Sequence, residues 1–220
     1  MRPLSLLEAR VLGVLVEKAH TVPDSYPLSL NALTLGCNQK TARDPVLAAS
    51  EGEVQPAADA LKQLSLAFES SGSRVSRYEH NVGRALGLPS QSVALLAVLM
   101  LRGPQTTSEL RANCERLHRF ADISAVEGFL DELAARPDEK GGSLVARLAR
   151  APGSREARWA QLLTGPVSAA SLATAADGED FVAVSELAGL KARLASAEAE
   201  IIALRSLVDR LYAELDISRT

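Results

Sequence analysis

The chain has 220 residues, of which 47% are hydrophobic and 23% are charged, a composition typical of a globular protein and unlike a fibrous or disordered one. Its formal net charge of −3 gives no general attraction to polyanions, and its longest apolar run, residues 93–101, is about half the length that a membrane helix needs. The first residues lack the pattern of a signal peptide. We therefore expect a cytoplasmic protein in which Cys37 and Cys114 are free, buried thiols.

A first helix is predicted over residues 4–18, where leucine and valine recur at helical spacing. Ser5 and Glu8 stand in the positions of a capping box, in which each side chain accepts a hydrogen bond from the other residue's backbone N–H. Two prolines within residues 21–27 then predict a loop. After this loop, Ser29 is expected to cap a short second helix.

The connection at residues 38–49 leads to a third helix. Because the residue before a proline is disfavoured in helical geometry, we expect an ordered turn or a short helical piece that begins at Pro45. Ser50 and Glu53 form the capping box of the third helix, which is predicted to end near residue 66. Pro56 lies inside this helix, where it should remove one hydrogen bond and kink the axis.

A short hairpin follows, with strands predicted at residues 66–69 and 74–78 and turn-forming residues between them. Three helices followed by a hairpin make a winged helix, and the connection at residues 38–49 makes its helix-turn-helix an elaborated one. We assign residues 1–84 to this first winged-helix domain.

The same order of elements recurs along the next hundred residues. The apolar run at residues 11–15 aligns with residues 95–99, whereas Ser29 aligns with Thr106 at a smaller offset. An offset that changes only at loops is expected of two copies of one fold with different loop lengths.

The second copy has a predicted third helix over residues 124–136 and predicted wing strands over residues 144–150 and 156–162. Trp159, on the return strand, is expected to pack on its own domain. We assign residues 85–165 to winged-helix domain 2. The predicted fold class is therefore mainly α with small β wings, built from two tandem winged-helix (helix-turn-helix) domains and a C-terminal coiled-coil helix.

The C-terminal part of the chain is predicted to be a linker at residues 166–185 and a coiled-coil helix at residues 186–217. Apolar residues in the second segment alternate in steps of three and four. We expect a parallel homodimer, with a trimer or a single helix folded back on its own domains as the alternatives. The predicted dimerisation residues are Leu187, Leu190, Leu194, Ile201, Leu204, Val208, Leu211 and Leu215.

Two motifs, SYPLSLNAL at residues 25–33 and CNQKTARDPV at residues 37–46, resemble those of the YceH family of uncharacterised bacterial proteins. The resemblance covers about residues 3–165. It implies two winged-helix domains in tandem and brings no activity, ligand or catalytic residue. The chain departs from the family pattern at Thr41-Ala42, where Ser-Asn is common, and at Pro56, where a small non-proline residue is usual.

The charge of the third helices bears on how such a fold would bind DNA. A winged helix commonly lays its third helix in the major groove. Here residues 50–66 carry three carboxylates against Lys62, and residues 124–136 carry three against Arg136. Since phosphate neutralisation supplies most of the non-specific affinity for DNA, the sequence favours contact through the wings.

The cations of the wings and the polar residues of the connection are the candidate contacts with a nucleic acid or a protein partner. For the connection, the alternative is structural: Asn38 caps the preceding helix end, while Arg43 and Asp44 satisfy local backbone groups and each other. For the wing arginines, the alternative is a solvated strand surface. The candidate contact residues are Asn38, Gln39, Lys40, Arg43, Arg74, Arg77, Arg147, Arg150 and Arg158.

No catalytic, metal or cofactor site is predicted. Cys114 and His118, four residues apart, would share a helix face, but two ligands do not make a zinc site. The sequence contains no glycine-rich phosphate loop, nucleophile elbow or His-Glu-x-x-His helix. We therefore expect a protein that is not an enzyme and has no membrane partner.

The predicted function is DNA binding, in a regulatory role, led by the wings rather than by a helix in the major groove. The alternative is a protein-interaction scaffold that uses the acidic third helices and the C-terminal coiled coil. The fold favours the first function, and the charge of the third helices favours the second.

Overall fold

The computed structural model describes residues 1–70, 75–150 and 156–167. The predicted linker and coiled-coil segment, with all of the dimerisation residues, lie outside these ranges, as does Arg74. The described chain is mainly helical and carries two small antiparallel sheets, one of three strands and one of two. No helix within it is both long enough and apolar enough to cross a membrane.

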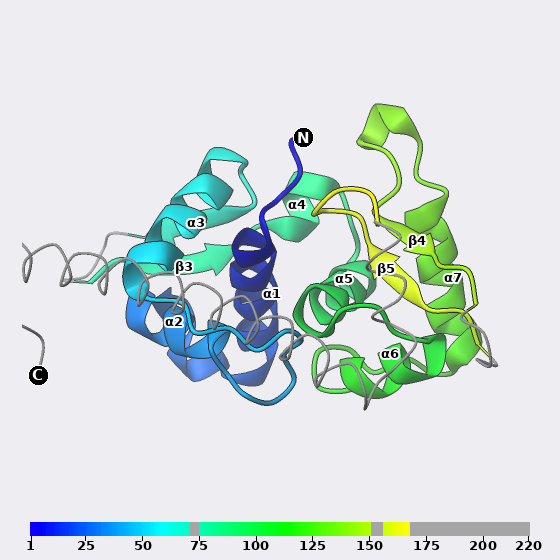
Figure 1. Ribbon diagram of the computed structural model, residues 1–220, viewed down its shortest axis with the longest axis horizontal. Coiled ribbons are helices and arrows are strands. Elements are labelled where there is room, and N and C mark those ends of the chain that lie inside the picture. Colours follow the sequence, from blue (N-terminus) through cyan, green and yellow to red (C-terminus); the bar gives the residue numbers. More distant parts are fainter. Residues whose placement is uncertain (71–74, 151–155, 168–220) are drawn as a thin grey trace, which may run out of the picture. The chain divides into compact units, whose positions relative to one another are not determined.

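The first copy contains three α-helices and a three-stranded sheet (Figure 1). The strand order is β1-β3-β2, and every pairing is antiparallel. In chain order the elements are α1 (Leu6–Thr21), the 3₁₀ helix η1 (Pro23–Ser25), β1 (Leu28–Ser29), α2 (Leu30–Cys37), α3 (Glu51–Gln63), β2 (Ala67–Ser70) and β3 (Arg77–His80).

The helix starts predicted for this copy are confirmed. The Ser5 hydroxyl accepts a hydrogen bond from the Glu8 N–H at 3.1 Å, and the Glu8 carboxylate accepts one from the Ser5 N–H at 2.7 Å. The Ser29 hydroxyl likewise accepts from the N–H of Ala32. Each contact satisfies a backbone donor that the first turn of a helix leaves without a partner.

The second copy repeats the order of the first. After one short helix, its three longer helices correspond in order to α1, α2 and α3. The isolated bridge between Gln105 and Trp159 corresponds in chain order to the pairing of β1 with β3. The elements are α4 (Val82–Leu86), α5 (Ser90–Arg102), α6 (Thr107–Cys114), α7 (Ile123–Ala134), the 3₁₀ helix η2 (Asp138–Lys140), β4 (Val145–Arg147) and β5 (Trp159–Gln161).

Several boundaries differ from those predicted. Of the ordered turn and the short helical piece expected at Pro45, the helical piece is not formed, and the chain runs without regular structure until Ser50 caps α3. The third helix ends at Gln63 rather than near residue 66, and the second copy's third helix is capped by Asp122 one residue before Ile123, because the Asp122 carboxylate accepts from the N–H of Ala125.

Pro56 lies within α3, which continues past it. The proline ring is exposed, and so is Gly52, whose carbonyl loses its usual helical donor. This carbonyl can therefore be hydrated, which lowers the cost of the missing hydrogen bond.

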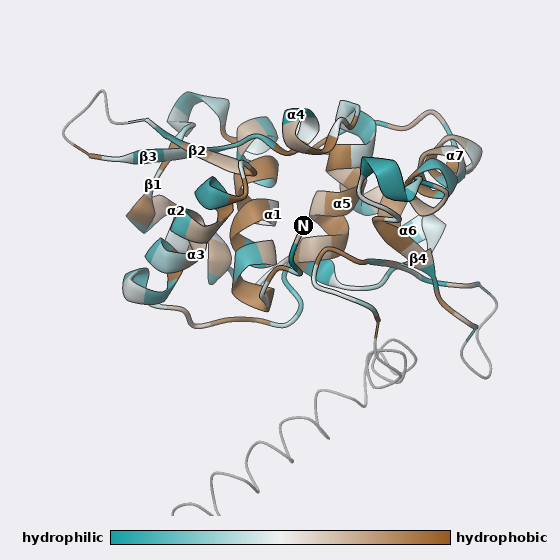
Figure 2. Cartoon of the chain, turned by 90° about the horizontal axis from the view of Figure 1, so that it is seen from above, coloured by the Kyte–Doolittle hydropathy of each residue, from teal (hydrophilic) through white to brown (hydrophobic). Residues whose placement is uncertain are grey.

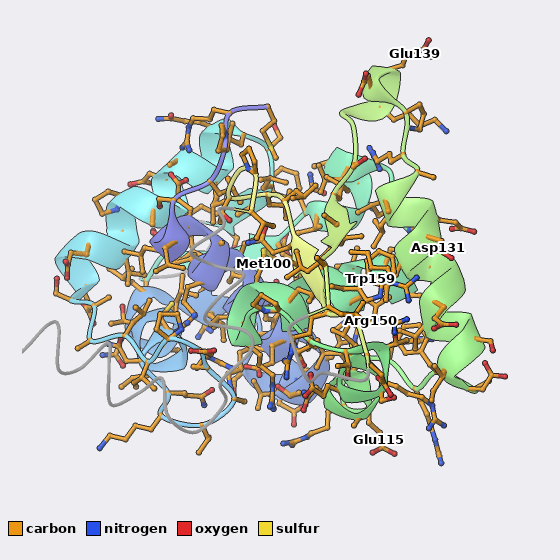
Figure 3. The ribbon with its side chains drawn as sticks, turned by 45° about the vertical axis from the view of Figure 1, so that its right-hand side comes forward. Met100, Glu115, Asp131, Glu139, Arg150 and Trp159 are labelled. Atoms are coloured by element: carbon orange, nitrogen blue, oxygen red, sulfur yellow. The ribbon has the colours of Figure 1, made fainter. Side chains whose placement is uncertain are left out.

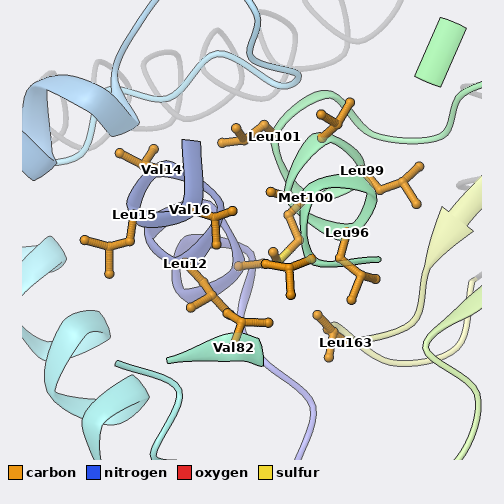
Figure 4. Packing of buried hydrophobic residues seen from close by; sticks show 14 of the residues in the cluster. Leu12, Val14, Leu15, Val16, Val82, Leu96, Leu99, Met100, Leu101 and Leu163 are labelled. Carbon is orange, nitrogen blue, oxygen red and sulfur yellow. The ribbon is translucent and has the colours of Figure 1, made fainter. Parts of the chain in front are cut away.

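The two copies share one apolar core, and residues 1–167 belong to a single compact unit. Helices α1 and α5 pack against each other with their apolar faces together (Figure 2). Val16 and Met100 lie between the two helices (Figure 4), and the Leu4 N–H donates to the Leu163 carbonyl at 2.8 Å. The predicted boundary between residues 84 and 85 falls inside α4.

Gly13 permits the close approach of these two helices. A Cβ atom at this position would lie 2.9 Å from Cγ of the buried Leu101. Gly128 in α7 offers a matched contrast, because a Cβ atom there would meet no atom within 4 Å.

We predict opposite effects of alanine at these two helical glycines. Gly128→Ala should raise the free energy of unfolding by roughly 0.5–1 kcal/mol through helix propensity alone. Gly13→Ala gains the same propensity but overpacks the α1–α5 contact, which costs about 1–3 kcal/mol, so it should lower the free energy of unfolding. Urea titrations of the two variants measure this difference, and equal stabilisation of both would contradict the described packing.

Candidate functional site

The polar connection between α2 and α3 is held by hydrogen bonds within the protein. The Asn38 side-chain amide donates to the Ala49 carbonyl at 2.7 Å and accepts from the Ala49 N–H at 2.8 Å. A single side chain therefore joins the start of the connection to its end. Asn38 is also the C-terminal cap of α2, as the structural alternative proposed.

Arg43 is inside the protein. Its side chain is 0% exposed and makes a two-pronged ion pair with Glu17 of α1, with nitrogen–oxygen distances of 3.1 and 2.6 Å. Its Nε donates to the Gly36 carbonyl, and Nη2 donates to the Gln39 side chain at 2.7 Å. Arg43 and the half-buried Gln39 are therefore engaged with the fold and do not present their polar groups to a partner.

The ion pair sets the charge of Glu17. Burial alone would raise the pKa of Glu17, but the hydrogen bonds and the positive charge of Arg43 bring this pKa below its usual range. The carboxylate therefore remains ionised opposite the buried guanidinium at neutral pH.

A second buried guanidinium, Arg10, contacts the same region and was not singled out from the sequence. Arg10 is 0% exposed, and it donates to the Cys37 carbonyl at 3.1 Å and to the Pro45 carbonyl at 2.6 Å. Burial, with the nearby charge of Arg43, lowers the pKa of Arg10. The contact with Cys37 places a cation at the carboxyl end of α2, where the helix dipole favours one.

Arg10, Glu17 and Arg43, with the carbonyls of Gly36 and Cys37, are here called the α2 lock. The Asp44 N–H extends the lock to the second copy by donating to the Leu101 carbonyl, at the end of α5, at 2.8 Å. Three polar side chains of the CNQKTARDPV motif, those of Asn38, Gln39 and Arg43, therefore form hydrogen bonds within the protein.

Ala42, within the motif, has a φ of 59°. This left-handed conformation is strained for alanine and easier for asparagine or glycine.

Lys40 is the remaining predicted cation of the connection. It is exposed and forms no ion pair or hydrogen bond with any described residue. In the first hairpin, Arg77 is exposed and donates to the Pro27 carbonyl at 2.8 Å. Lys62 of α3 is paired with both Asp59 and Glu69.

In the second hairpin one arginine is paired within the protein and two are exposed. Arg158 pairs with Glu109 of α6 at 3.1 Å and donates to the Pro104 carbonyl. Arg147 and Arg150 are exposed, and neither has a carboxylate partner in the described part of the chain. The Arg147 guanidinium carbon lies 5.9 Å from the centre of the Trp159 ring.

Trp159 is only 4% exposed, which confirms that it packs on its own domain (Figure 3). Backbone hydrogen bonds in both directions with Gln105 fix this residue at the base of the hairpin. Arg147 of β4 is paired with Trp159 in the same hairpin, and Arg150 follows the end of β4.

The outward faces of the third helices are acidic. Glu127, Asp131 and Glu132 of α7 are exposed, and Asp131 projects away from the rest of the chain (Figure 3). Glu51 and Glu53 are exposed at the start of α3. Either helix would therefore meet a phosphate backbone with like charge.

Both cysteines are free and buried, as predicted. Burial raises the pKa of the Cys37 and Cys114 thiols to about 12, so neither forms a reactive thiolate at neutral pH. Within the described ranges no group of three His, Cys, Asp or Glu side chains could hold a metal ion. His118 packs its ring against Phe120 instead.

We predict that Arg43→Ala destabilises the protein by about 3–5 kcal/mol, because it removes one member of a buried ion pair. The loss should be present at pH 7 and should shrink as the pH falls from about 4.3, the pKa of an unperturbed glutamate, through the lower pKa of Glu17 in the folded protein, where protonation ends the pair in the wild type as well. Urea unfolding at pH 7 and at about pH 3 measures both effects, with Lys40→Ala as the control from the same connection. A loss of less than 1 kcal/mol at pH 7 would contradict the structural role of Arg43.

Comparison with known proteins places the chain in a family. Residues 4–154 match the family described as "Protein of unknown function, DUF480". A UPF0502 protein of Paraburkholderia phytofirmans is 60% identical over 99% of this chain and 91% of its own length, and one of Methylibium petroleiphilum is 64% identical over 92% and 85%. The name YceH does not occur in these matches. The chain therefore belongs to the DUF480 (UPF0502) family of bacterial proteins of unknown function.

Proposed function

We propose that this protein is a tandem winged-helix protein that binds duplex DNA through the phosphate backbone, with Arg147 and Arg150 of the second hairpin as its leading contacts. The order of elements supports the winged-helix assignment. In each copy three helices precede an antiparallel hairpin, and a short pairing segment lies between the first and second helices.

The observation that carries the proposal is that these two arginines are exposed and have no carboxylate partner among the described residues. Two of the other predicted cations are neutralised within the fold, Arg43 by Glu17 and Arg158 by Glu109, whereas Lys40 and Arg77 are exposed in the first copy. Arg147 and Arg150 are exposed at the surface, so a phosphate could contact them without displacing a carboxylate of the described residues. Such contacts supply affinity without reading sequence.

The acidic third helices support a wing-led geometry. A major-groove approach by α7 would bring the exposed carboxylates of Glu127, Asp131 and Glu132 close to two phosphate strands. An approach through the hairpin places the arginines against the backbone and leaves α7 facing solvent. A regulatory role would then need specificity from a second source, such as DNA shape or a second protomer.

We also propose that residues 186–217 form a parallel coiled coil that pairs two copies of the chain. The support is the run of apolar residues in steps of three and four from Leu187 to Leu215. Pairing would double the number of hairpins on one duplex and so raise the overall affinity.

A protein-interaction scaffold is the second candidate. Its specific support is the exposed acidic face of α7 beside Ile123, which is 43% exposed at the start of that helix. An apolar side chain rimmed by carboxylates suits a basic protein partner.

The DNA proposal is tested by fluorescence anisotropy with a mixed-sequence duplex at several salt concentrations. We expect the binding constant of the full-length protein to fall steeply with salt, and the slope of log K against log salt to become shallower by about 1.8 in the Arg147→Ala/Arg150→Ala variant. Lys140→Ala, which removes an exposed cation of η2 in the same copy, should leave the slope unchanged. No salt-dependent binding at low salt would contradict the proposal and favour the scaffold.

For the tail, we expect light scattering to give twice the chain mass for the full-length protein and a single chain mass for a variant that ends at Gly165. The experiment should be run at micromolar concentration. A full-length protein that is monomeric under these conditions would contradict the coiled-coil proposal, and three times the chain mass would select the trimer.

A further inference from the structure

We propose that the turn between α6 and α7, residues 115–122, is a second phosphate-contact site, and that the second copy alone forms the DNA-binding surface. This inference rests on the function proposed above and adds a site that lies outside both hairpins.

Two arginines of the turn are available to a partner. Arg116 and Arg119 are both exposed, and neither forms a hydrogen bond or an ion pair with a described residue. The carboxylates of the turn are Glu115, which is exposed, and Asp122, which caps α7 through the N–H of Ala125. Asp122 is exposed but is engaged by the N–H of Ala125 at the start of α7, whereas the two arginines have no partner among the described residues.

The backbone of the turn is anchored from inside. Phe120 is 4% exposed and makes edge-to-face contacts with the rings of His118 at 4.8 Å and Phe129 at 5.9 Å. The Arg111 side chain donates to the Ala121 carbonyl at 3.1 Å, and the N–H of His118 donates to the Cys114 carbonyl at 2.8 Å. An anchored turn holds its arginines in place before binding, which lowers the entropic cost of ordering them.

The equivalent connection in the first copy is built differently. Within residues 38–49, Arg43 is buried as part of the α2 lock, and Lys40 is exposed and takes no part in the lock. The neighbouring helix α3 offers only Lys62, which two carboxylates neutralise. The same place in the fold is therefore structural in the first copy and charged at the surface in the second.

Duplex DNA is the polyanion that fits this arrangement. The turn precedes α7 in the chain and the hairpin follows it, so exposed arginines flank the acidic helix on both sides in sequence. Contacts from both flanks would touch the sugar-phosphate backbone and keep the carboxylates of α7 out of the groove. Binding of this kind depends on the charge of the arginines and not on base identity.

The test is a salt titration of duplex binding by the full-length Arg116→Ala/Arg119→Ala variant, with Lys40→Ala as the matched control from the first copy. We expect the slope of log K against log salt to become shallower by about 1.8, and affinity at 0.1 M salt to fall by on the order of 50-fold. Arg116→Lys/Arg119→Lys should retain most of the affinity, since it keeps both charges. Lys40→Ala should bind as the wild type does.

The outcomes separate this inference from the proposed function. If Arg147→Ala/Arg150→Ala weakens binding while Arg116→Ala/Arg119→Ala does not, the proposed function stands and the turn site is wrong. If Lys40→Ala weakens binding as much as the turn variant, the assignment to the second copy is wrong. If the wild type shows no salt-dependent binding, the proposed function fails, and this inference fails with it. Thermal unfolding followed by circular dichroism verifies that each variant is folded.

Discussion

Two buried guanidinium groups at the carboxyl end of α2 constrain the first copy and its contact with the second. Arg10 and Arg43 donate to the carbonyls of Cys37 and Gly36, and Glu17 supplies the negative charge that Arg43 needs in the interior. The last carbonyls of a helix have no partner within the helix, and a cation is favoured there. Because Arg10 and Glu17 both belong to α1, the lock ties α2 to the helix that also packs against α5.

This arrangement separates the two copies by role. The longer connection of the first copy uses its polar residues internally: Asn38 on Ala49, Arg43 on Glu17 and the Asp44 N–H on Leu101. The second copy connects its corresponding helices by a shorter turn anchored on Phe120, and its arginines remain at the surface. Under the proposed function, the first copy supports the fold and the second meets the phosphate backbone.

The sequence predicted the elements that depend on local signals. Capping residues such as Ser5 and Ser29 mark helix starts because their side chains satisfy backbone donors nearby in the chain, and the repeat of apolar runs indicated two copies. The two-residue strand β1 was missed, since it exists only by pairing with β3, nearly fifty residues further along. An ordered turn or a short helical piece was expected at Pro45, and no helical piece is formed there because the backbone makes long-range contacts with Arg10 and Leu101.

The site was harder to predict than the fold. Charged residues are usually exposed, so a motif rich in them resembles a contact surface, and the burial of Arg43 follows only from Glu17, which lies 26 residues earlier in the chain. Arg10 stands in an apolar helix face, where only a partner distant in sequence explains it. Exposure without a partner, the property that distinguishes Arg116 and Arg150, likewise depends on the three-dimensional positions of all neighbouring carboxylates.

Hydrogen–deuterium exchange of the full-length protein, with and without a mixed-sequence duplex, tests the division between the two copies most directly. The account predicts that DNA slows exchange in residues 115–122 and 145–150. Residues 38–49, whose Ala49 and Asp44 amides are already hydrogen-bonded in the free protein, should exchange equally with and without DNA. Protection of residues 38–49 by DNA, with no change in residues 115–122 and 145–150, would contradict it.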